Sequence, residues 1–286
     1  MKIKKQILAG ALALATTFTM NVPALAADSV FCVALGADLS AEEKSKVLGI
    51  MDLSEDDLDG HEVTVTNQEE HKYLDDYLSA SVIGSRALSS VYVREASDGY
   101  GIQVTTHNIT YCTTGMYQNA LATAGLKNAT VVVAGPFDLS GTAALIGAVK
   151  AYSELSGEPI QAEALEAATD ELVTTGEIAE DIGSSDAEAL VGAVKDTIVA
   201  EGITDEDGIN QAIDDAAKKL DITLSDEDKA KINDVMQKVG DLDLNADDLK
   251  EQAKQLYDKL GELNVSKEQV QGWFSKLLAW LKQLLS

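Results

Sequence analysis

Two different hydrophobic patterns divide the chain near residue 158. Before this point, short β-branched runs alternate with polar positions and are interrupted by glycine, which is typical of strands and turns. After it, apolar residues recur at helical spacing in charged stretches rich in alanine and leucine. The sequence therefore predicts an α+β domain over 27–158 and a helical domain over 159–286, joined at "SGEPI".

The α+β domain is expected to begin with alternating strands and helices. Strands are predicted over 29–35 and 62–66, and a helix follows each of them. Both helices begin with a capping box, in which a Ser or Thr side chain and a Glu three residues later bind each other's backbone amides. The two capping residues are Ser40 and Thr66.

The next two strands are predicted to pair as a β-hairpin. "LSSVYVREA" and "GIQVTTHNI" are separated by "SDGY", and Asp98-Gly99 supplies the positive φ that a hairpin turn needs. A helix over 113–125 and the strand "ATVVVAG" follow. The resulting β-α-β-β-α-β order is that of a ferredoxin-like core within a mixed sheet.

Four consecutive segments of the second domain begin with a helix-capping residue. Each is followed three positions later by Asp or Gln and then by an apolar stripe; the caps are Thr204, Ser225, Asn245 and Ser266. Successive helices with short links predict an all-α helical array. Acidic side chains in the first turns complement the helix dipoles, which gives much of the negative charge a structural explanation.

The first 26 residues have the three parts of a secretory signal. A basic start and the apolar stretch "ILAGALALATTF" precede "ALA" (24–26), a small-x-small cleavage site. The apolar stretch is shorter than the roughly 20 residues that span a bilayer. We therefore expect a signal peptide over 1–26 and a secreted, extracellular protein.

The chain is strongly acidic, with 22 Lys and Arg against 48 Asp and Glu and a formal net charge of -26. This charge excludes nucleic acid as a partner, because phosphates demand a basic face. It suits basic neighbours, or simply keeps an exported chain soluble. The expected partner is an unidentified envelope component or protein.

Two cysteines, Cys32 and Cys112, lie in expected strands of one sheet. An exported protein permits a disulfide between them. Their Cα atoms would have to lie within about 7 Å, which sequence spacing does not show. A disulfide and two buried free thiols are both open at this point.

The stretch "AGPFDLSGTAALIG" (134–147) predicts a strand, a loop and a helix of small residues. A P-loop is excluded, because five residues separate Gly135 from Gly141 and Thr142 stands in place of the lysine. We expect Ser140 to cap the helix and the small residues to let it pack closely on the sheet. The alternative is a ligand site at Ser140, Gly141 and Thr142, since helix N-termini bind anions.

Arg86 is one of two arginines among many acids and lies in the small, apolar setting "IGSRALSS". We expect its guanidinium to be partly buried and paired with Glu69 or Glu70, because bidentate carboxylate pairing suits arginine. The alternative is that Arg86 anchors an acidic group of a ligand.

Catalytic and metal motifs are not indicated. No serine lies in a G-x-S-x-G or S-x-x-K motif. His71 and Asp75 lie one helical turn apart, but two ligands do not make a zinc site, so an ion pair is expected. "DLDLNADDL" resembles an EF-hand loop, but Ala246 replaces its glycine and Gln252 its bidentate glutamate. We expect no metal, no other cofactor and no catalytic residue.

These observations favour a non-catalytic binding or interaction module, secreted or associated with the cell envelope. The alternative is an extracellular hydrolase that works with carboxylates and a polar patch of four residues: Thr105, His107, Asn108 and Thr110.

The last predicted helix has an aromatic, apolar face with basic flanks. Its apolar side chains fall within an arc of about 160° at 100° per residue. Such a helix can lie in a membrane interface, or it can close the helical array. The candidate membrane or partner contacts are Trp273, Phe274, Leu277, Trp280 and Leu281.

Five segments between roughly residues 30 and 180 resemble a known family. "VTVTNQEEHKYL", "IGSRALSSVYV", "GIQVTTHNIT", "MYQNALATAGLKNATVVVAGPFDLSGTAALIGAVKAY" and "ELVTTGEIAE" occur in the order found in the secreted bacterial family labelled domain of unknown function 1002. The resemblance implies export from a Gram-positive-type bacterium and one continuous family domain. It implies no catalytic or binding residue, because the family has no assigned activity.

Overall fold

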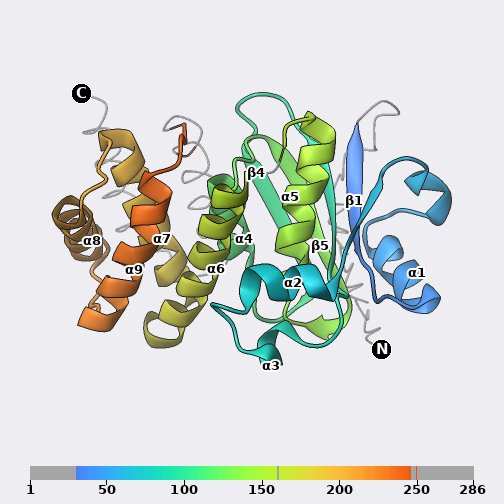
Figure 1. Cartoon of the computed structure of the whole chain (residues 1–286), viewed down its shortest axis with the longest axis horizontal. Coiled ribbons are helices and arrows are strands. Elements are labelled where there is room, and N and C mark those ends of the chain that lie inside the picture. Colours follow the sequence, from blue (N-terminus) through green and yellow to red (C-terminus); the bar gives the residue numbers. More distant parts are fainter. Residues whose placement is uncertain (1–29, 160, 246–248, 250–286) are drawn as a thin grey trace, which may run out of the picture.

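The computed structural model describes residues 30–159, 161–245 and 249. One mixed sheet has the strand order β2-β1-β3-β5-β4 (Figure 1). Its strands are β1 (Phe31–Gly36), β2 (Glu62–Val65), β3 (Ser90–Glu95), β4 (Ile102–Ile109) and β5 (Ala129–Leu139).

The first five helices are interleaved with these strands: α1 (Ala41–Ile50), α2 (Asn67–Leu74), α3 (Ala80–Ile83), α4 (Thr114–Thr123) and α5 (Thr142–Ser156). A short 3-10 helix spans Glu55–Leu58. The rest of the described chain is helical: α6 (Ala162–Ile182), α7 (Ser184–Glu201), α8 (Glu206–Leu220) and α9 (Asp226–Gly240). The mixed α+β architecture followed by helices is confirmed. No helix in the described ranges is long and apolar enough to cross a bilayer.

The predicted β-hairpin is wrong, because β3 and β4 are not neighbours. β5 lies between them, antiparallel to β3 and parallel to β4. Gly99 adopts the expected positive φ of 78°, but the connection leads past an interior position next to β3 rather than back along β3. β5 occupies that position because its valine-rich start is apolar towards both faces, as a central strand requires. The ferredoxin-like topology is not confirmed.

Four strands run in one direction and β3 runs in the other. β1 is parallel to β2, β4 is parallel to β5, and both β1 and β5 are antiparallel to β3. The carboxyl ends of β1, β2, β4 and β5 therefore lie along one edge of the sheet, which we call the carboxyl edge. Helices α1, α2 and α5 begin at this edge directly after their strands.

Helices cover the two faces of the sheet unequally. One face packs on α4 and α5 around a core that includes Val91, Val104 and Val131. The other face packs on α1 through a smaller core that includes Val33 and Leu48. The predicted close packing of α5 is confirmed at Gly147, where an added Cβ would lie 3.0 Å from the Cβ of Ala34.

Three of the capping predictions are confirmed. Ser40 and Thr66 form capping boxes with Glu43 and Glu69. Ser225 caps α9 and accepts a hydrogen bond from the backbone N–H of Asp228.

The predicted cap Thr204 is wrong by one residue. The carboxylate of Asp205 caps α8 and accepts a hydrogen bond from the backbone N–H of Gly208. A carboxylate at this position also benefits from the positive end of the helix dipole. The pairs Asn245/Asp248 and Ser266/Gln269, the signal peptide and the amphipathic helix lie wholly or partly outside the described residues.

The helical part packs directly on the α+β part. Helix α6 lies against α4 (Figure 1), and its residues Leu165, Ala168 and Leu172 belong to the same core as the sheet. The division into two domains near residue 158 stays a prediction.

Candidate functional site

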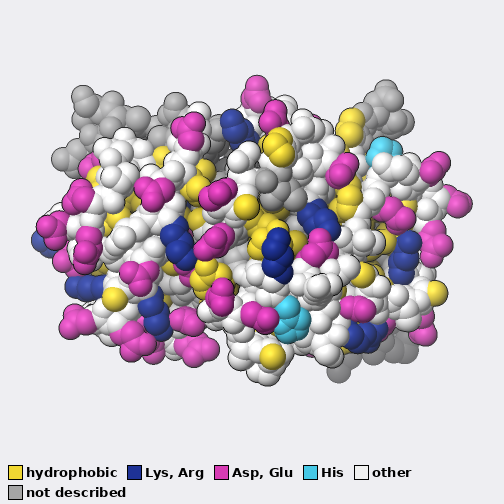
Figure 2. Space-filling view, viewed as in Figure 1, with side chains coloured by type: hydrophobic (Ala, Val, Ile, Leu, Met, Phe, Trp, Pro, Cys, Tyr) yellow, Lys and Arg dark blue, Asp and Glu magenta, His cyan; other side chains and the backbone are white. Residues whose placement is uncertain are grey.

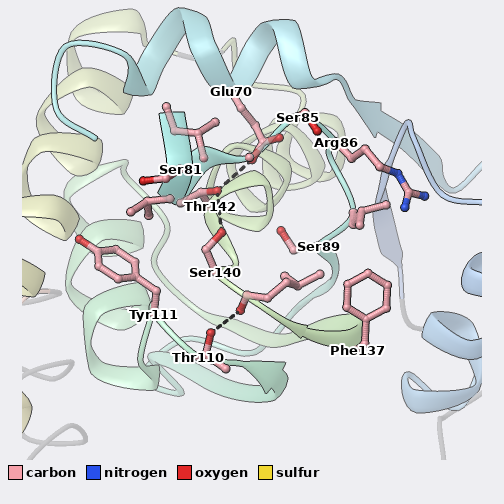
Figure 3. Close-up of a pocket in the computed structure, with 15 residues that line it drawn as sticks. Glu70, Ser81, Ser85, Arg86, Ser89, Thr110, Tyr111, Phe137, Ser140 and Thr142 are labelled. Atoms are coloured by element: carbon pink, nitrogen blue, oxygen red, sulfur yellow. Dashed lines mark hydrogen bonds between the residues drawn. The ribbon is translucent and has the colours of Figure 1, made fainter. Parts of the chain in front are cut away.

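A cavity of about 520 Å³ opens at the carboxyl edge, and we call it the carboxyl-edge pocket. Its volume falls within the roughly 300–1,000 Å³ of small-molecule sites. The described residues that line it are Glu70, Ser81, Val82, Ile83, Gly84, Ser85, Arg86, Leu88, Ser89, Thr110, Tyr111, Phe137, Leu139, Ser140 and Thr142 (Figure 3).

Strand ends position this pocket. Thr110 follows β4, Ser140 follows β5, and Ser89 immediately precedes the antiparallel strand β3. In sheets with parallel strands, ligands bind outside the carboxyl ends, where the loops leave a crevice. The carboxyl-edge pocket has this location. Helix α3 and the residues after it close the side opposite β4 and β5.

Glu70 lies at the inner wall of the pocket and is only 1% exposed. Its Oε1 accepts a hydrogen bond from Thr142 Oγ1 (2.9 Å), and its Oε2 accepts one from Asn67 Nδ2 (3.1 Å). Burial raises the pKa of Glu70, and these two hydrogen bonds offset only part of the rise. The pocket therefore contains a carboxyl group whose neutral form is favoured relative to an exposed glutamate.

Two further hydroxyls extend this hydrogen-bond chain. Ser140 Oγ lies 3.3 Å from Thr142 Oγ1. Because Thr142 gives its single proton to Glu70, its oxygen is left to accept one from Ser140. Ser89 Oγ accepts a hydrogen bond from the backbone N–H of Ala144 (3.0 Å) and keeps its own proton to donate.

The predicted cap at Ser140 is wrong. Gly141 is the N-cap of α5, without a side-chain capping bond, and Ser89 from the adjacent strand end satisfies an amide of the first turn instead. Gly141 has φ 98°, and an added Cβ would lie 2.6 Å from Tyr117 Oη and from Ile109 Cγ2. Gly141 is therefore required for packing, with its carbonyl accepting a hydrogen bond from the Tyr117 hydroxyl.

Arg86 borders the pocket, but its guanidinium points away from it (Figure 3). It donates to Glu43 Oε2 and to the Asp38 carbonyl, each at 2.7 Å. Its hydrogen bond to Glu43 is the main cause that lowers the pKa of that carboxyl to about 2.

The predicted pairing of Arg86 with Glu69 or Glu70 is wrong. Those carboxylates have other partners, since Lys150 lies 2.6 Å from Glu69 and Thr142 binds Glu70. The Arg86 side chain as a whole is 45% exposed.

The polar patch predicted on β4 is not brought into the pocket. Thr105 and His107 are exposed along β4, and neither lines the cavity. Asn108 has φ 57° at an irregularity of the strand, where its Nδ2 donates to the Gly135 carbonyl at 2.8 Å. Only Thr110, the last residue of that patch, lines the pocket.

The other predicted candidates are structural. His71 Nδ1 lies 2.6 Å from Asp75 Oδ1, as expected for an ion pair on the helix surface. Cys32 and Cys112 are buried free thiols, and burial raises their pKa to about 11 and about 12. Among the described residues, no three His, Cys, Asp or Glu side chains gather as metal ligands.

Several residues of the pocket were not predicted from the sequence: Glu70, Ser81, Ser85, Ser89, Tyr111 and Phe137. A signal for some of them was present, because hydroxyl residues follow β4 and β5 directly and Ser89 directly precedes β3. To predict that these residues lie together, one must know that β5 lies next to β4 and parallel to it. The predicted hairpin placed β3 next to β4 instead. Glu70 gave no such signal, since its burial depends on α5.

A second polar cluster is fully enclosed between α4, α6 and α7. Lys195 Nζ donates to Glu171 Oε1 (2.9 Å), to the Asn119 carbonyl (2.7 Å) and to Thr123 Oγ1 (3.2 Å). Lys195 is 2% exposed and Glu171 is fully buried. Because the cluster has no access to solvent, it holds the three helices together rather than forming a ligand site.

The fold and the pocket define a mixed α+β protein with a hydroxyl-lined cavity at the carboxyl edge of its sheet. The chain belongs to the family described as "Protein of unknown function (DUF1002)", whose model matches residues 35–256. It is similar to the "Uncharacterized protein YpuA" of Bacillus subtilis (strain 168), with 40% identity over 268 residues that cover 92% of this chain and 91% of that relative. No solved structure matches the chain.

Proposed function

We propose that this is a secreted, envelope-associated binding protein without catalytic activity, and that the carboxyl-edge pocket is its ligand site. One observation carries the proposal: an open, partly apolar cavity at the carboxyl ends of parallel strands brings together the hydroxyl groups of six serine and threonine residues. Convergent polar groups within a concave, partly apolar cavity are typical of small-ligand sites.

The chemistry of the lining favours binding over catalysis. A serine or threonine nucleophile needs an adjacent base, and the described lining residues include no His, Lys or Cys. Glycoside hydrolysis uses two carboxyl groups about 5–9.5 Å apart, and Glu70 is the single carboxyl in the described lining. The pocket therefore offers hydrogen bonds but lacks a pair of reacting groups.

One observation favours the hydrolase as the second candidate. Glu70 combines burial, a raised pKa and a position in a concave pocket, which is the combination expected of a general acid. On this alternative, the chain would release soluble fragments from its ligand, and Glu70→Gln would abolish that release while the ligand still bound.

The acidic surface bears on the partner. Figure 2 shows Asp and Glu side chains over the whole visible face, with Lys and Arg dispersed between them. The face in view therefore offers no basic surface for nucleic acid. The predicted signal peptide and the resemblance to exported proteins support an extracellular location with an envelope component as the ligand.

Sedimentation with purified cell-wall sacculi tests the proposed function. Ser85 is an exposed residue of the pocket rim, and Ser45 is an exposed residue of α1 away from it. Ser85→Trp fills the mouth of the pocket, so we expect it to lower the sedimented fraction at least fivefold, while Ser45→Trp leaves the fraction unchanged.

Mass spectrometry of the same supernatants separates binding from hydrolysis. The binding proposal expects no soluble fragment above a blank without protein. Equal sedimentation of the two variants would contradict the pocket as the site. Fragments that depend on Glu70 would replace the binding proposal with the hydrolase.

A further inference from the structure

Building on the proposed function, we propose that the carboxyl-edge pocket binds an uncharged, polyhydroxylated ligand, namely a short stretch of a saccharide chain. Three features of the pocket carry this inference: the hydroxyl groups that line it, the lack of a free charge facing it, and two aromatic side chains on its opposite sides.

Hydroxyl groups make up most of the polar lining. They belong to Ser81, Ser85, Ser89, Thr110, Ser140 and Thr142, whereas the Tyr111 hydroxyl lies beside Gly176 of α6. A hydroxyl can donate and accept, so it matches a sugar hydroxyl in either role. Ser140 and Ser89 illustrate both roles: the Ser140 oxygen has lone pairs to offer, and the Ser89 oxygen accepts from Ala144 and keeps a proton to give.

The charged groups of the lining are already engaged within the protein. Arg86 is the single cation in the described lining, and it is bound to Glu43 and to the Asp38 carbonyl outside the pocket. An anionic ligand would therefore meet no free cation there, and it would be repelled by a chain of net charge -26.

A cationic ligand gains little from Glu70. Both of its oxygens already accept hydrogen bonds, and the side chain is 1% exposed. An ammonium group would have to lose its water to reach this buried carboxylate, at a desolvation cost that offsets the attraction. The lining therefore favours a ligand without formal charge.

Two aromatic rings lie on opposite sides of the cavity. Figure 3 shows Tyr111 on the side of the α3 helix and Phe137 across the pocket from it. Phe137 is 47% exposed, one of few large apolar side chains on the described surface with that exposure. The C–H faces of a pyranose ring are slightly positive and pack on the negative face of an aromatic ring. This arrangement offers stacking positions for sugar rings at both ends of the hydroxyl-lined floor.

Isothermal titration of the mature chain tests the ligand class with four probes. The neutral saccharides are chitotetraose and cellotetraose, and the charged probes are inorganic phosphate and a lysine-containing tripeptide. We expect saturable binding of at least one neutral saccharide and at least tenfold weaker binding of both charged probes.

Aromatic variants locate the binding. Phe137→Ala removes an exposed ring from the pocket, so the fold should persist and the saccharide affinity should fall at least tenfold. Tyr100→Ala is the matched control, because Tyr100 is 41% exposed and lies between β3 and β4, at the sheet edge opposite the pocket. This control should bind as the parent chain does.

Three results would overturn the inference: no binding of either neutral saccharide, tighter binding of a charged probe, or equal saccharide affinity of the parent chain and Phe137→Ala. These failures are distinguishable from failure of the proposed function. If Ser85→Trp lowers sacculus sedimentation while both saccharides fail to bind, the pocket is still the binding site and its ligand is of another class.

Discussion

Gly141 illustrates how single residues fix the geometry of the pocket. It lies between Ser140 and Thr142, adopts φ 98°, and leaves no room for a Cβ beside Tyr117 and Ile109. Side chains of L-residues are strained in this backbone region, and overpacking adds to the cost. The small residue that suggested an anion site in the sequence is therefore a packing requirement.

Gly141→Ala should lower the free energy of unfolding by at least about 2 kcal/mol, from the strain of positive φ plus the clash with Tyr117 and Ile109. Gly49→Ala in α1 is the control, since an added Cβ there meets no heavy atom within 4 Å. The control should be neutral or stabilising by up to about 1 kcal/mol. Urea unfolding of both variants measures the difference, and equal effects would contradict the packing role.

Asp196 makes stability depend on pH in an unusual direction. It is buried, its Oδ2 has no hydrogen-bond partner among the described residues, and burial raises its pKa to about 7. In the unfolded chain an aspartate releases its proton near pH 4. Between about pH 4 and 7 the folded state holds this proton and the unfolded state does not, so the contribution of Asp196 to stability falls as pH rises.

Asp196→Asn should remove this fall, because the amide carries no charge at any of these pH values. The variant's free energy of unfolding in urea, measured at constant ionic strength, should therefore rise relative to that of the parent chain when the pH is raised from 5 to 8. A difference between the two proteins that is the same at both pH values would contradict the assignment.

Among the helices and strands, local signals predicted the structure better than long-range pairing did. The Ser40 and Thr66 caps were predictable because a capping box involves residues three apart. The position of β5 between β3 and β4 depends on which strand is apolar on both faces, a comparison across the whole sheet. Two alternating strands joined by a glycine turn fit a β-hairpin as well as they fit the observed arrangement. The sequence pattern alone therefore did not exclude the hairpin.

The contact between α4, α6 and α7 depends on the buried pair Lys195 and Glu171. Lys195→Met leaves the Glu171 carboxylate buried without its cation, which should cost about 3–5 kcal/mol. Lys229→Met is the control, because Lys229 pairs with Asp214 at the surface, where a salt bridge contributes little to stability.

Chemical denaturation of Lys195→Met and Lys229→Met measures how much unfolding free energy each variant loses. Adding Glu171→Met to Lys195→Met should recover much of the loss, since replacing both members of a buried pair by apolar residues is often neutral. Similar losses from the buried and the surface variants would show that the buried pair has no special role.

The predicted amphipathic segment 266–286 lies outside the described residues, and its membrane contact stays a prediction. Liposome flotation of the mature chain with and without this segment tests it. Loss of flotation in the shorter chain is the expected result, because the aromatic, apolar face with basic flanks suits a membrane interface. Equal flotation of the two chains would eliminate the membrane contact.

For the whole molecule, the sequence predicted the fold class but only part of the site. Ser140 and Thr142 were candidates and line the pocket, whereas Thr105 and His107 lie on the open face of β4. Alternation along a strand indicates which residues share a face of the sheet. The carboxyl edge can be located only when it is known that four of the strands run in the same direction. Glu70 reaches that edge through the packing of α2 on α5, which no local pattern encodes.

The most direct test of the central claim, that the carboxyl-edge pocket is a ligand site, is NMR chemical-shift mapping. The ¹⁵N-labelled mature chain would be titrated with solubilised peptidoglycan fragments from a Gram-positive wall. The account predicts that the largest amide shifts cluster at Ser85, Thr110, Phe137 and Thr142. Saturable shifts confined to the helices α6–α9, with these four amides unmoved, would contradict it.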